Sequence, residues 1–177
     1  LLLGVAFANI FAGVPIDGEG VFHGNLLTYL NPYGLLGGVL FVLLFLVHGA
    51  IWGAWRTEGG LGDRAARAAE RLWPALLVVA VVFLVASWFA TPLYANYLSM
   101  TLLWVFPLAA VAGLVLTRVF VAQRAWGKAW AFSALTILGA TSFGVAGLFP
   151  NIFPSSLDPA FSRTAFNAAS TPKTLGI

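Results

Sequence analysis

Four stretches of this chain contain no Asp, Glu, Lys or Arg, and each is long enough to cross a membrane as a helix. They are residues 34–55, 74–91, 98–117 and 129–149. About 20 helical residues, at 1.5 Å rise each, span a hydrocarbon layer roughly 30 Å thick. Because only 8% of the residues are charged and the mean hydropathy is +0.93, a water-soluble domain is excluded. The sequence predicts an all-α, polytopic transmembrane helix bundle with about four complete spans.

Residues 1–13 form a further apolar run that is too short to cross a membrane. The run has no basic residue, does not begin with Met and leads to Pro15. We interpret it as the end of a fifth span whose beginning is missing. Residues 150–177 follow the last span as an outer C-terminal segment without a closing element. Residues 1–177 are therefore expected to be a single membrane-embedded domain and a fragment of a longer protein.

The basic residues predict the orientation of the bundle. Seven of the nine Lys and Arg residues fall in residues 56–71 and 118–128, whereas the connections on the other side, residues 14–33 and 92–97, contain none. The positive-inside rule therefore places the two arginine-rich loops in the cytoplasm. Their cations are spread over loops rather than gathered in a basic stripe, so no nucleic acid partner is expected. Within the first loop, residues 63–71 are expected to form a short surface helix that leads into the second span.

The first complete span carries four glycines that are expected to form one face for close helix contact. Gly34 and Gly38 make one Gly-x-x-x-Gly pair, and Gly49 and Gly53 make another. His48 lies near the edge of this face, so we expect it to point toward a neighbouring helix, because an ionisable side chain facing lipid is costly. A hydrogen bond to that helix is the favoured role. Proton transfer, quinone contact, and metal or haem ligation are the alternatives.

The other spans differ in their residue types. Residues 76–85 are bulky all round and are expected to face lipid, whereas residues 129–149 are rich in Gly, Ala, Ser and Thr and predict a central helix. The hydroxyl groups of this last span are expected to bond to carbonyls of their own helix, with a hydrated proton path as the alternative. Pro150 should stop the helix, and Ser155 or Ser156 could cap a short outer helix.

Catalytic motifs are not visible in the sequence. His23 lies in a loop and His48 lies about 20 Å into a span, so the two histidines cannot share one iron. A pair of His23 and Met100 at the outer surface is an alternative. The chain also lacks Cys, a nucleotide-binding loop, a zinc motif and a hydrolase elbow. We therefore predict no catalytic, cofactor-binding or metal-binding residue in this chain.

Short motifs in a fixed order run along nearly the whole chain. They are residues 3–9, 13–15, 30–38, 48–50, 130–132, 149–150, 154–156, 168–170 and 174–175. In this order and spacing they resemble subunit II of cytochrome bd quinol oxidase, a bacterial respiratory terminal oxidase. The residues expected to have a structural role are Asn31, Pro32, Gly34, Gly38, Gly49, Gly53, Phe149, Pro150, Pro154, Ser155 and Ser156.

The resemblance implies a non-haem subunit of an electrogenic oxidase in the bacterial cytoplasmic (inner) membrane. The chain would supply about the fourth to the eighth of nine helices. Haems b and d and the main quinol-oxidising loop would belong to the partner, subunit I, with which this subunit forms a heterodimer. Quinone and membrane lipid are further expected partners. This subunit would support quinol oxidation and the reduction of O2 to water without a catalytic residue in these helices.

Two other classes of protein remain as alternatives. A secondary transporter would place a binding site between broken helices at the midplane of the membrane. Here the Gly and Pro interruptions fall at span ends, and no intramembrane charge pair is present in the sequence. A membrane assembly or scaffold protein would take no part in turnover.

Overall fold

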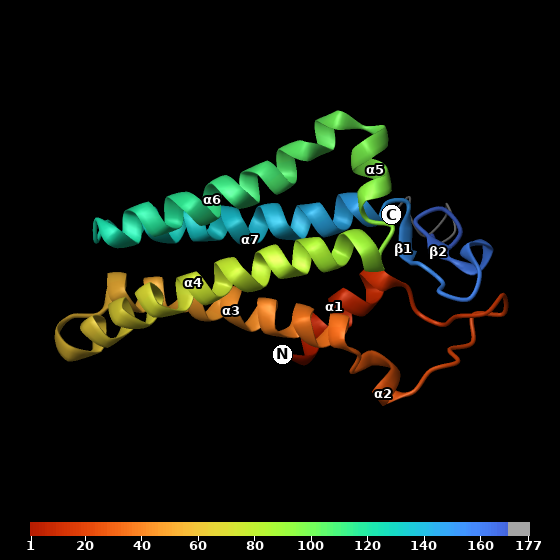
Figure 1. Ribbon diagram of the computed structural model, residues 1–177, viewed down its shortest axis with the longest axis horizontal. Coiled ribbons are helices and arrows are strands. Elements are labelled where there is room, and N and C mark those ends of the chain that lie inside the picture. Colours follow the sequence, from red (N-terminus) through yellow and green to blue (C-terminus); the bar gives the residue numbers. More distant parts are fainter. Residues whose placement is uncertain (170–177) are drawn as a thin grey trace, which may run out of the picture.

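The computed structural model describes residues 1–169, which form a bundle of long helices with a small cap at one end (Figure 1). Four helices are long and apolar enough to cross a membrane, so the predicted helix bundle is confirmed. They are α3 (Pro32–Arg56), α4 (Gly59–Ala90), α6 (Val105–Ala122) with the 3-10 turn η1 (Thr101–Trp104), and α7 (Trp126–Leu148). The motif residues 170 and 174–175, and the last part of segment 150–177, lie outside the described residues.

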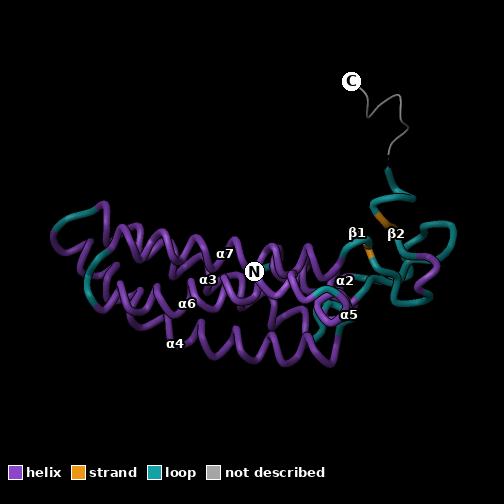
Figure 2. The backbone as a smooth tube through the Cα atoms, turned by 90° about the horizontal axis from the view of Figure 1, so that it is seen from above, coloured by secondary structure: helices purple, strands orange, loops and turns teal. Residues whose placement is uncertain are grey.

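Shorter elements lie mainly at the end of the bundle that holds the connections between α1 and α3 and between α4 and α6 (Figure 2). The helices are α1 (Leu2–Ala12), α2 (Leu26–Tyr29) and α5 (Tyr94–Ser99), with the 3-10 turn η2 (Pro159–Phe161). Two short strands, β1 (Asn151–Phe153) and β2 (Arg163–Thr164), pair antiparallel and add a small sheet that the sequence did not predict. We call the end of the bundle that carries these shorter elements the capped end. We call the opposite end, which carries residues 56–71 and 118–128, the arginine end.

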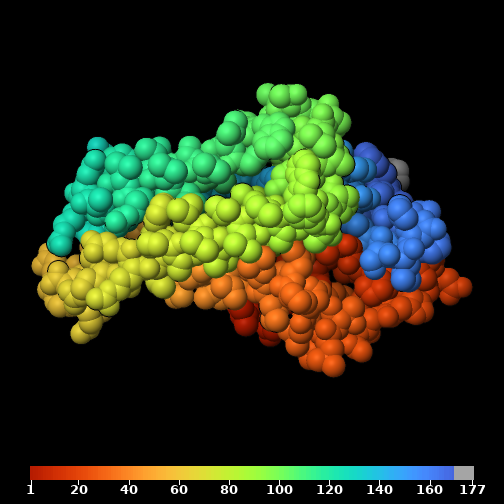
Figure 3. Space-filling model, viewed as in Figure 1, coloured from red at the N-terminus to blue at the C-terminus, as the bar shows by residue number. Residues whose placement is uncertain are grey.

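The helices pack as two antiparallel pairs. α3 lies along α4 and α6 lies along α7, and α7 also contacts α3, so the pairs form one bundle. α1 packs on α3. Figure 3 shows α4 and α6 next to each other on one face of the molecule. Between these two helices, the indole nitrogen of Trp73 donates to the carbonyl oxygen of Leu114 at 3.0 Å.

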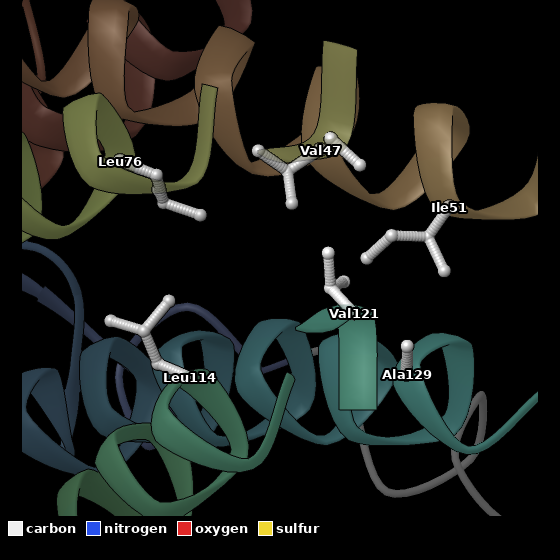
Figure 4. Packing of buried hydrophobic residues seen from close by; sticks show 7 residues of the cluster. Val47, Ile51, Leu76, Leu114, Val121 and Ala129 are labelled. Atoms are coloured by element: carbon white, nitrogen blue, oxygen red, sulfur yellow. The ribbon is translucent and has the colours of Figure 1, made fainter. Parts of the chain in front are cut away.

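Apolar side chains from all four spanning helices meet in a core near the arginine end. Val47 and Ile51 of α3 face Val121 of α6 and Ala129 of α7, while Leu76 and Leu114 close the cluster (Figure 4). A second cluster, nearer the capped end, joins the 0%-exposed Leu93 with Tyr97 and Phe143. Large apolar side chains cover much of the remaining surface, as expected for helices whose solvent is lipid.

The helix α4 corrects one sequence expectation. Residues 63–71 do not form a separate surface helix, because α4 continues without a break from Gly59 through Pro74 to Ala90. Proline removes one backbone donor, but membrane helices tolerate this loss when neighbouring groups supply other contacts. The resulting helix has 32 residues and is about 48 Å long, which exceeds the hydrocarbon layer. Its first turns therefore extend beyond the layer at the arginine end.

Candidate functional site

His48 of α3 forms a hydrogen bond to the neighbouring helix α7. Its Nδ1 atom lies 2.7 Å from Ser133 Oγ. Ser133 Oγ donates its single proton to the carbonyl oxygen of Trp130 at 2.8 Å. The imidazole Nδ1–H is therefore the donor to Ser133, and Nε2 is the acceptor nitrogen of the neutral ring. His48 points to a neighbouring helix, as the sequence predicted.

Three tryptophans and an arginine extend this contact toward the arginine end. The rings of His48 and Trp130 lie 5.4 Å apart, and Trp130 in turn lies 5.4 Å from Trp52 and 6.0 Å from Trp55. The guanidinium of Arg56 lies 5.4 Å and 5.6 Å from the rings of Trp52 and Trp55. These aromatic neighbours favour packing and hydrogen bonding at His48 over acid–base chemistry.

The glycines of α3 contact α1 at only part of the predicted face. A Cβ atom on Gly34 would lie 2.5 Å from Asn9 Nδ2, and one on Gly38 would lie 2.8 Å from Val5 Cγ2. Gly53 is nearer to ordinary contact, with its Cβ position 3.2 Å from Ala65 Cβ. Gly49 has no atom within 4 Å of its Cβ position, so the expected close contact at Gly49 is wrong for the residues described.

Gly37, which is not one of the four glycines of the predicted face, lies at a close contact between α3 and α1. Its Cβ position lies 2.5 Å from Ala8 Cβ and 3.2 Å from the carbonyl oxygen of Gly4. Gly4 in turn has a Cβ position 2.7 Å from the carbonyl oxygen of Gly37. The adjacent pair Gly37 and Gly38 was the signal in the sequence, because two small residues widen the groove that α1 enters.

Asn31 and Pro32 begin α3 and connect it to α1. Asn31 Oδ1 accepts from the backbone nitrogen of Gly34 at 2.7 Å, and Pro32 occupies the first turn, where its missing N–H has no consequence. Asn31 Nδ2 donates to Asn9 Oδ1 at 2.6 Å. Asn9 Nδ2 donates to the carbonyl oxygens of Val5 and Tyr29, both at 2.8 Å. The motif residues here fix a helix start.

The end of α7 is held by Asn96, a residue that sequence reasoning missed. Asn96 Nδ2 donates to the carbonyl oxygens of Ala146 at 3.0 Å, Gly147 at 3.2 Å and Phe149 at 2.5 Å. α7 ends at Leu148, and Pro150 then stops the helix as predicted. The amide of Asn96 thus satisfies carbonyls that have no partner within the helix.

Ser155 joins the two segments that build the cap. Ser155 Oγ donates to the carbonyl oxygen of Ile16 at 2.6 Å. The backbone nitrogen of Val14 donates to the carbonyl oxygen of the buried Pro154 at 2.8 Å. The backbone nitrogen of Ser156 donates to the carbonyl oxygen of Val14 at 3.0 Å. Neither serine caps a helix, contrary to the prediction. Asp158 caps η2 instead, with its Oδ1 accepting from Ala160 at 2.8 Å.

Asp17 organises the loop that follows α1. Its Oδ1 accepts from the backbone nitrogens of Val21 at 2.8 Å and Glu19 at 3.0 Å, and its Oδ2 lies 2.5 Å from His23 Nε2. The hydrogen bond from His23, together with those from Val21 and Glu19, holds the pKa of Asp17 below its ordinary value. The carboxylate is therefore used to fix the loop.

Three hydroxyl groups of α7, those of Ser133, Thr136 and Thr141, bond to carbonyls of their own helix, as predicted. Thr136 Oγ1 donates to the carbonyl oxygen of Phe132 at 3.0 Å, and Thr141 Oγ1 donates to that of Ile137 at 2.9 Å. Thr136 and Ser133 also line a cavity of about 10 Å³ among the four spanning helices. This volume is about that needed for one water molecule, which falls short of a continuous hydrated path.

The two histidines of the chain lie too far apart to share one haem iron. His48 lies 16 residues after Pro32, about 24 Å along α3 from the end at which His23 is bound to Asp17. Met100, the alternative partner of His23, is a 56%-exposed residue between α5 and η1. Within residues 1–169, no group of three or more His, Cys, Asp or Glu residues could hold a metal ion.

Comparison with known proteins identifies the relatives of this bundle. The family described as cytochrome bd terminal oxidase subunit II matches residues 1–177. The chain belongs to this family. It is 32% identical over 173 residues to the cytochrome bd ubiquinol oxidase subunit 2 of Bacillus subtilis (strain 168), a match that covers 96% of the chain and 49% of the relative. The resemblance inferred from the ordered motifs is thus confirmed.

Two further subunit II relatives show the same coverage. The probable cytochrome oxidase subunit 2 of Haemophilus influenzae is 29% identical over 207 residues, which include 99% of this chain and 54% of the relative. The cytochrome bd-I ubiquinol oxidase subunit 2 of Escherichia coli (strain K12) is 28% identical over 211 residues, a match that covers 100% of this chain and 55% of the relative. The chain spans about half the length of the curated relatives it matches, and it is a multi-pass membrane protein of this oxidase family.

Proposed function

We propose that this chain is part of the non-haem subunit of a bacterial cytochrome bd quinol oxidase, which couples quinol oxidation to the reduction of O2 to water. Membership of the subunit II family over residues 1–177 is the observation that carries the proposal. The wide separation of His23 and His48 along the bundle is compatible with a subunit that holds no haem. The chain acts as a structural part of the oxidase and supplies no catalytic residue from these helices.

The proposed partner is subunit I, with which the full-length protein forms a heterodimer. The relatives are named as second subunits, which supports a first subunit as the partner. Haems b and d are proposed to lie in that partner, and quinone is proposed to bind to the complex. The structural motif residues described above hold the bundle against which subunit I packs.

The proposed location is the bacterial cytoplasmic membrane, with residues 1–177 as a single membrane-embedded domain. Residues 56–71 and 118–128 face the cytoplasm in this arrangement, because seven of the nine cations lie there. The capped end then faces outward. Arg163 is the one basic residue of the described capped end.

Purification of the full-length protein with and without subunit I tests the proposal. We expect haem absorption and quinol-dependent O2 consumption only when subunit I is present, and loss of activity when this subunit is removed. A haem spectrum carried by this subunit alone would rule the assignment out. Solute uptake in proteoliposomes without O2 consumption would favour a transporter, and full oxidase activity after deletion would favour an assembly factor.

A further inference from the structure

Three arginines lie on one face of the first turns of α4. Arg64, Arg67 and Arg71 are spaced three and four residues apart, so they fall within an arc of about 60°. All three are exposed. The sequence predicts a separate surface helix over residues 63–71, whereas the unbroken α4 aligns these three arginines with its own spanning part. Together they form the α4 basic stripe.

The α4 basic stripe continues directly into an exposed apolar face of the same helix. Val78, Val82, Val85 and Phe89 lie within about 40° of Arg71 around the helix axis. Their exposed fractions are 62%, 48%, 54% and 83%. The arginines therefore lie above an apolar face that is exposed in the described bundle, and not above the interior of the bundle.

The opposite side of the same turns packs inward. Ala66 and Ala69 are 6% and 0% exposed, and Ala69 belongs to the core cluster shown in Figure 4. The first turns of α4 are thus fixed in rotation about the helix axis. Their arginines cannot turn toward the bundle without exposing these alanines.

The depth of the α4 basic stripe matches the headgroup layer. When the 30 Å hydrocarbon layer is measured back from Ala90, its other boundary falls near Arg71. Arg67 and Arg64 then lie about 6 Å and 10 Å beyond this boundary. The headgroup layer is roughly 5–7 Å thick on each side, and the long side chain of Arg64 can reach back into it.

The guanidinium groups of the α4 basic stripe are available for an external anion. Within residues 1–169, the one ion pair joins His23 and Asp17 at the capped end. Asp63 and Glu70 lie on one flank of α4 and form no ion pair with the stripe. A planar guanidinium binds phosphate through two parallel hydrogen bonds, so a row of three suits phosphate groups well.

We propose that Arg64, Arg67 and Arg71 bind the phosphate groups of anionic phospholipids in the leaflet at the arginine end. The alignment with Val78, Val82, Val85 and Phe89 favours a lipid over an acidic surface of a partner protein, because one phospholipid carries both a phosphate for the arginines and acyl chains for the exposed apolar face. This binding holds anionic phospholipids at one corner of the bundle and fixes the depth of α4 in the membrane.

Lipid retention by the full-length protein, together with its co-purifying chains, tests the proposal. The protein is reconstituted in nanodiscs with equal phosphatidylglycerol and phosphatidylcholine, and retained lipids are counted by native mass spectrometry. We expect enrichment of phosphatidylglycerol that falls about fivefold for each arginine removed in R64Q, R67Q and R71Q and their triple combination. The matched variant R64K/R67K/R71K keeps most of the enrichment because it keeps the charge. High salt lowers the enrichment in the wild type.

Three results would overturn the proposal. The first is equal retention of the two lipids by the wild-type protein at low salt. The second is unchanged enrichment in the triple Gln variant. The third is loss of a co-purifying protein chain while phosphatidylglycerol enrichment persists, which would assign the stripe to a protein contact. If the triple variant does not fold, the single variant R67Q and the wild-type salt series decide between the outcomes.

Discussion

The Nδ1 atom of His48 donates a hydrogen bond to Ser133 Oγ across 2.7 Å and joins α3 to α7 over 85 residues of sequence. Ser133 Oγ in turn donates a hydrogen bond to the carbonyl oxygen of Trp130 in its own helix. The Nδ1–H group of His48 and the hydroxyl group of Ser133 thus both have a partner inside an apolar bundle, where each would be costly alone. The contact explains why a histidine is placed in the middle of a span.

Replacement of His48 by Ala should weaken the packing of α3 on α7. Hydrogen bonds between membrane helices contribute about 1 kcal/mol, so the free energy of unfolding should fall by about that amount, and further through the lost ring contact with Trp130. Unfolding of H48A, S133A and the double variant in mixed detergent gives the coupling between the two residues. If H48A instead shifts the pH profile of oxidase turnover while assembly is intact, the packing role is wrong.

Replacement of Gly37 by Ala should separate α1 from α3. The added methyl group would lie 2.5 Å from Ala8 Cβ, and such overpacking costs about 1–3 kcal/mol. Gly49→Ala in the same helix is the matched control, because nothing lies within 4 Å of its Cβ position. Thermal unfolding should show a clear loss for G37A and little change for G49A. Equal losses would contradict the assignment of close contact to Gly37.

These two glycines show how far the sequence predicts the structure. The hydrophobic lengths are sufficient to predict the four spans, because lipid sets the length that each helix needs. The spacing of Gly34, Gly38, Gly49 and Gly53 correctly indicates small residues, but it cannot show where a partner helix is present. α1 covers Gly34, Gly37 and Gly38 and does not reach Gly49, a fact that depends on tertiary packing.

The polar contacts of the bundle also divide into those that the sequence indicates and those that depend on tertiary packing. Asn31 and Pro32 are recognisable as a helix start because a cap acts locally, within three residues. Asn96 is not, because its partners on Ala146 and Gly147 lie 50 and 51 residues away. The continuity of α4 through Pro74 was missed for a related reason. A proline marks a break in water, whereas packed neighbours maintain a helix across it in a membrane.

Replacement of Asn96 by Ala should loosen the end of α7. The carbonyl oxygens of Ala146 and Gly147 would lose their side-chain donor, and an unsatisfied, partly buried carbonyl costs about 1–3 kcal/mol. Hydrogen exchange of α7 and the free energy of unfolding measure the effect. Thr141→Ala is the control, since this exposed hydroxyl bonds only within its own helix and should change stability by less than about 0.5 kcal/mol. Similar losses in both variants would show that Asn96 does not hold the helix end.

The loop held by Asp17 should open in acid. Because the pKa of Asp17 is lowered in the folded protein, mainly by His23, the carboxylate stabilises the loop fully above its ordinary, unfolded pKa. This stabilisation is lost as the pH falls through the lower, folded pKa. Protection of the Val21 and Glu19 amides from hydrogen exchange, corrected for intrinsic rates, should decrease over that range. Asp17→Asn keeps an acceptor oxygen but removes the charge, so its protection should be lower at pH 7 and nearly independent of pH.

Glu19→Gln is the matched control for this pH dependence. Glu19 lies in the same loop, and its side chain forms no hydrogen bond in the part of the chain that the structure describes. The variant should keep the wild-type pH dependence, because the hydrogen bonds from Val21, Glu19 and His23 to Asp17 are unchanged. Two results would show that the Asp17 carboxylate does not fix the loop. One is amide protection that does not change with pH in the wild type, and the other is the same loss of pH dependence in E19Q and D17N. The distinction matters for the cap as a whole, since Ser155 is bonded to Ile16, the residue directly before Asp17.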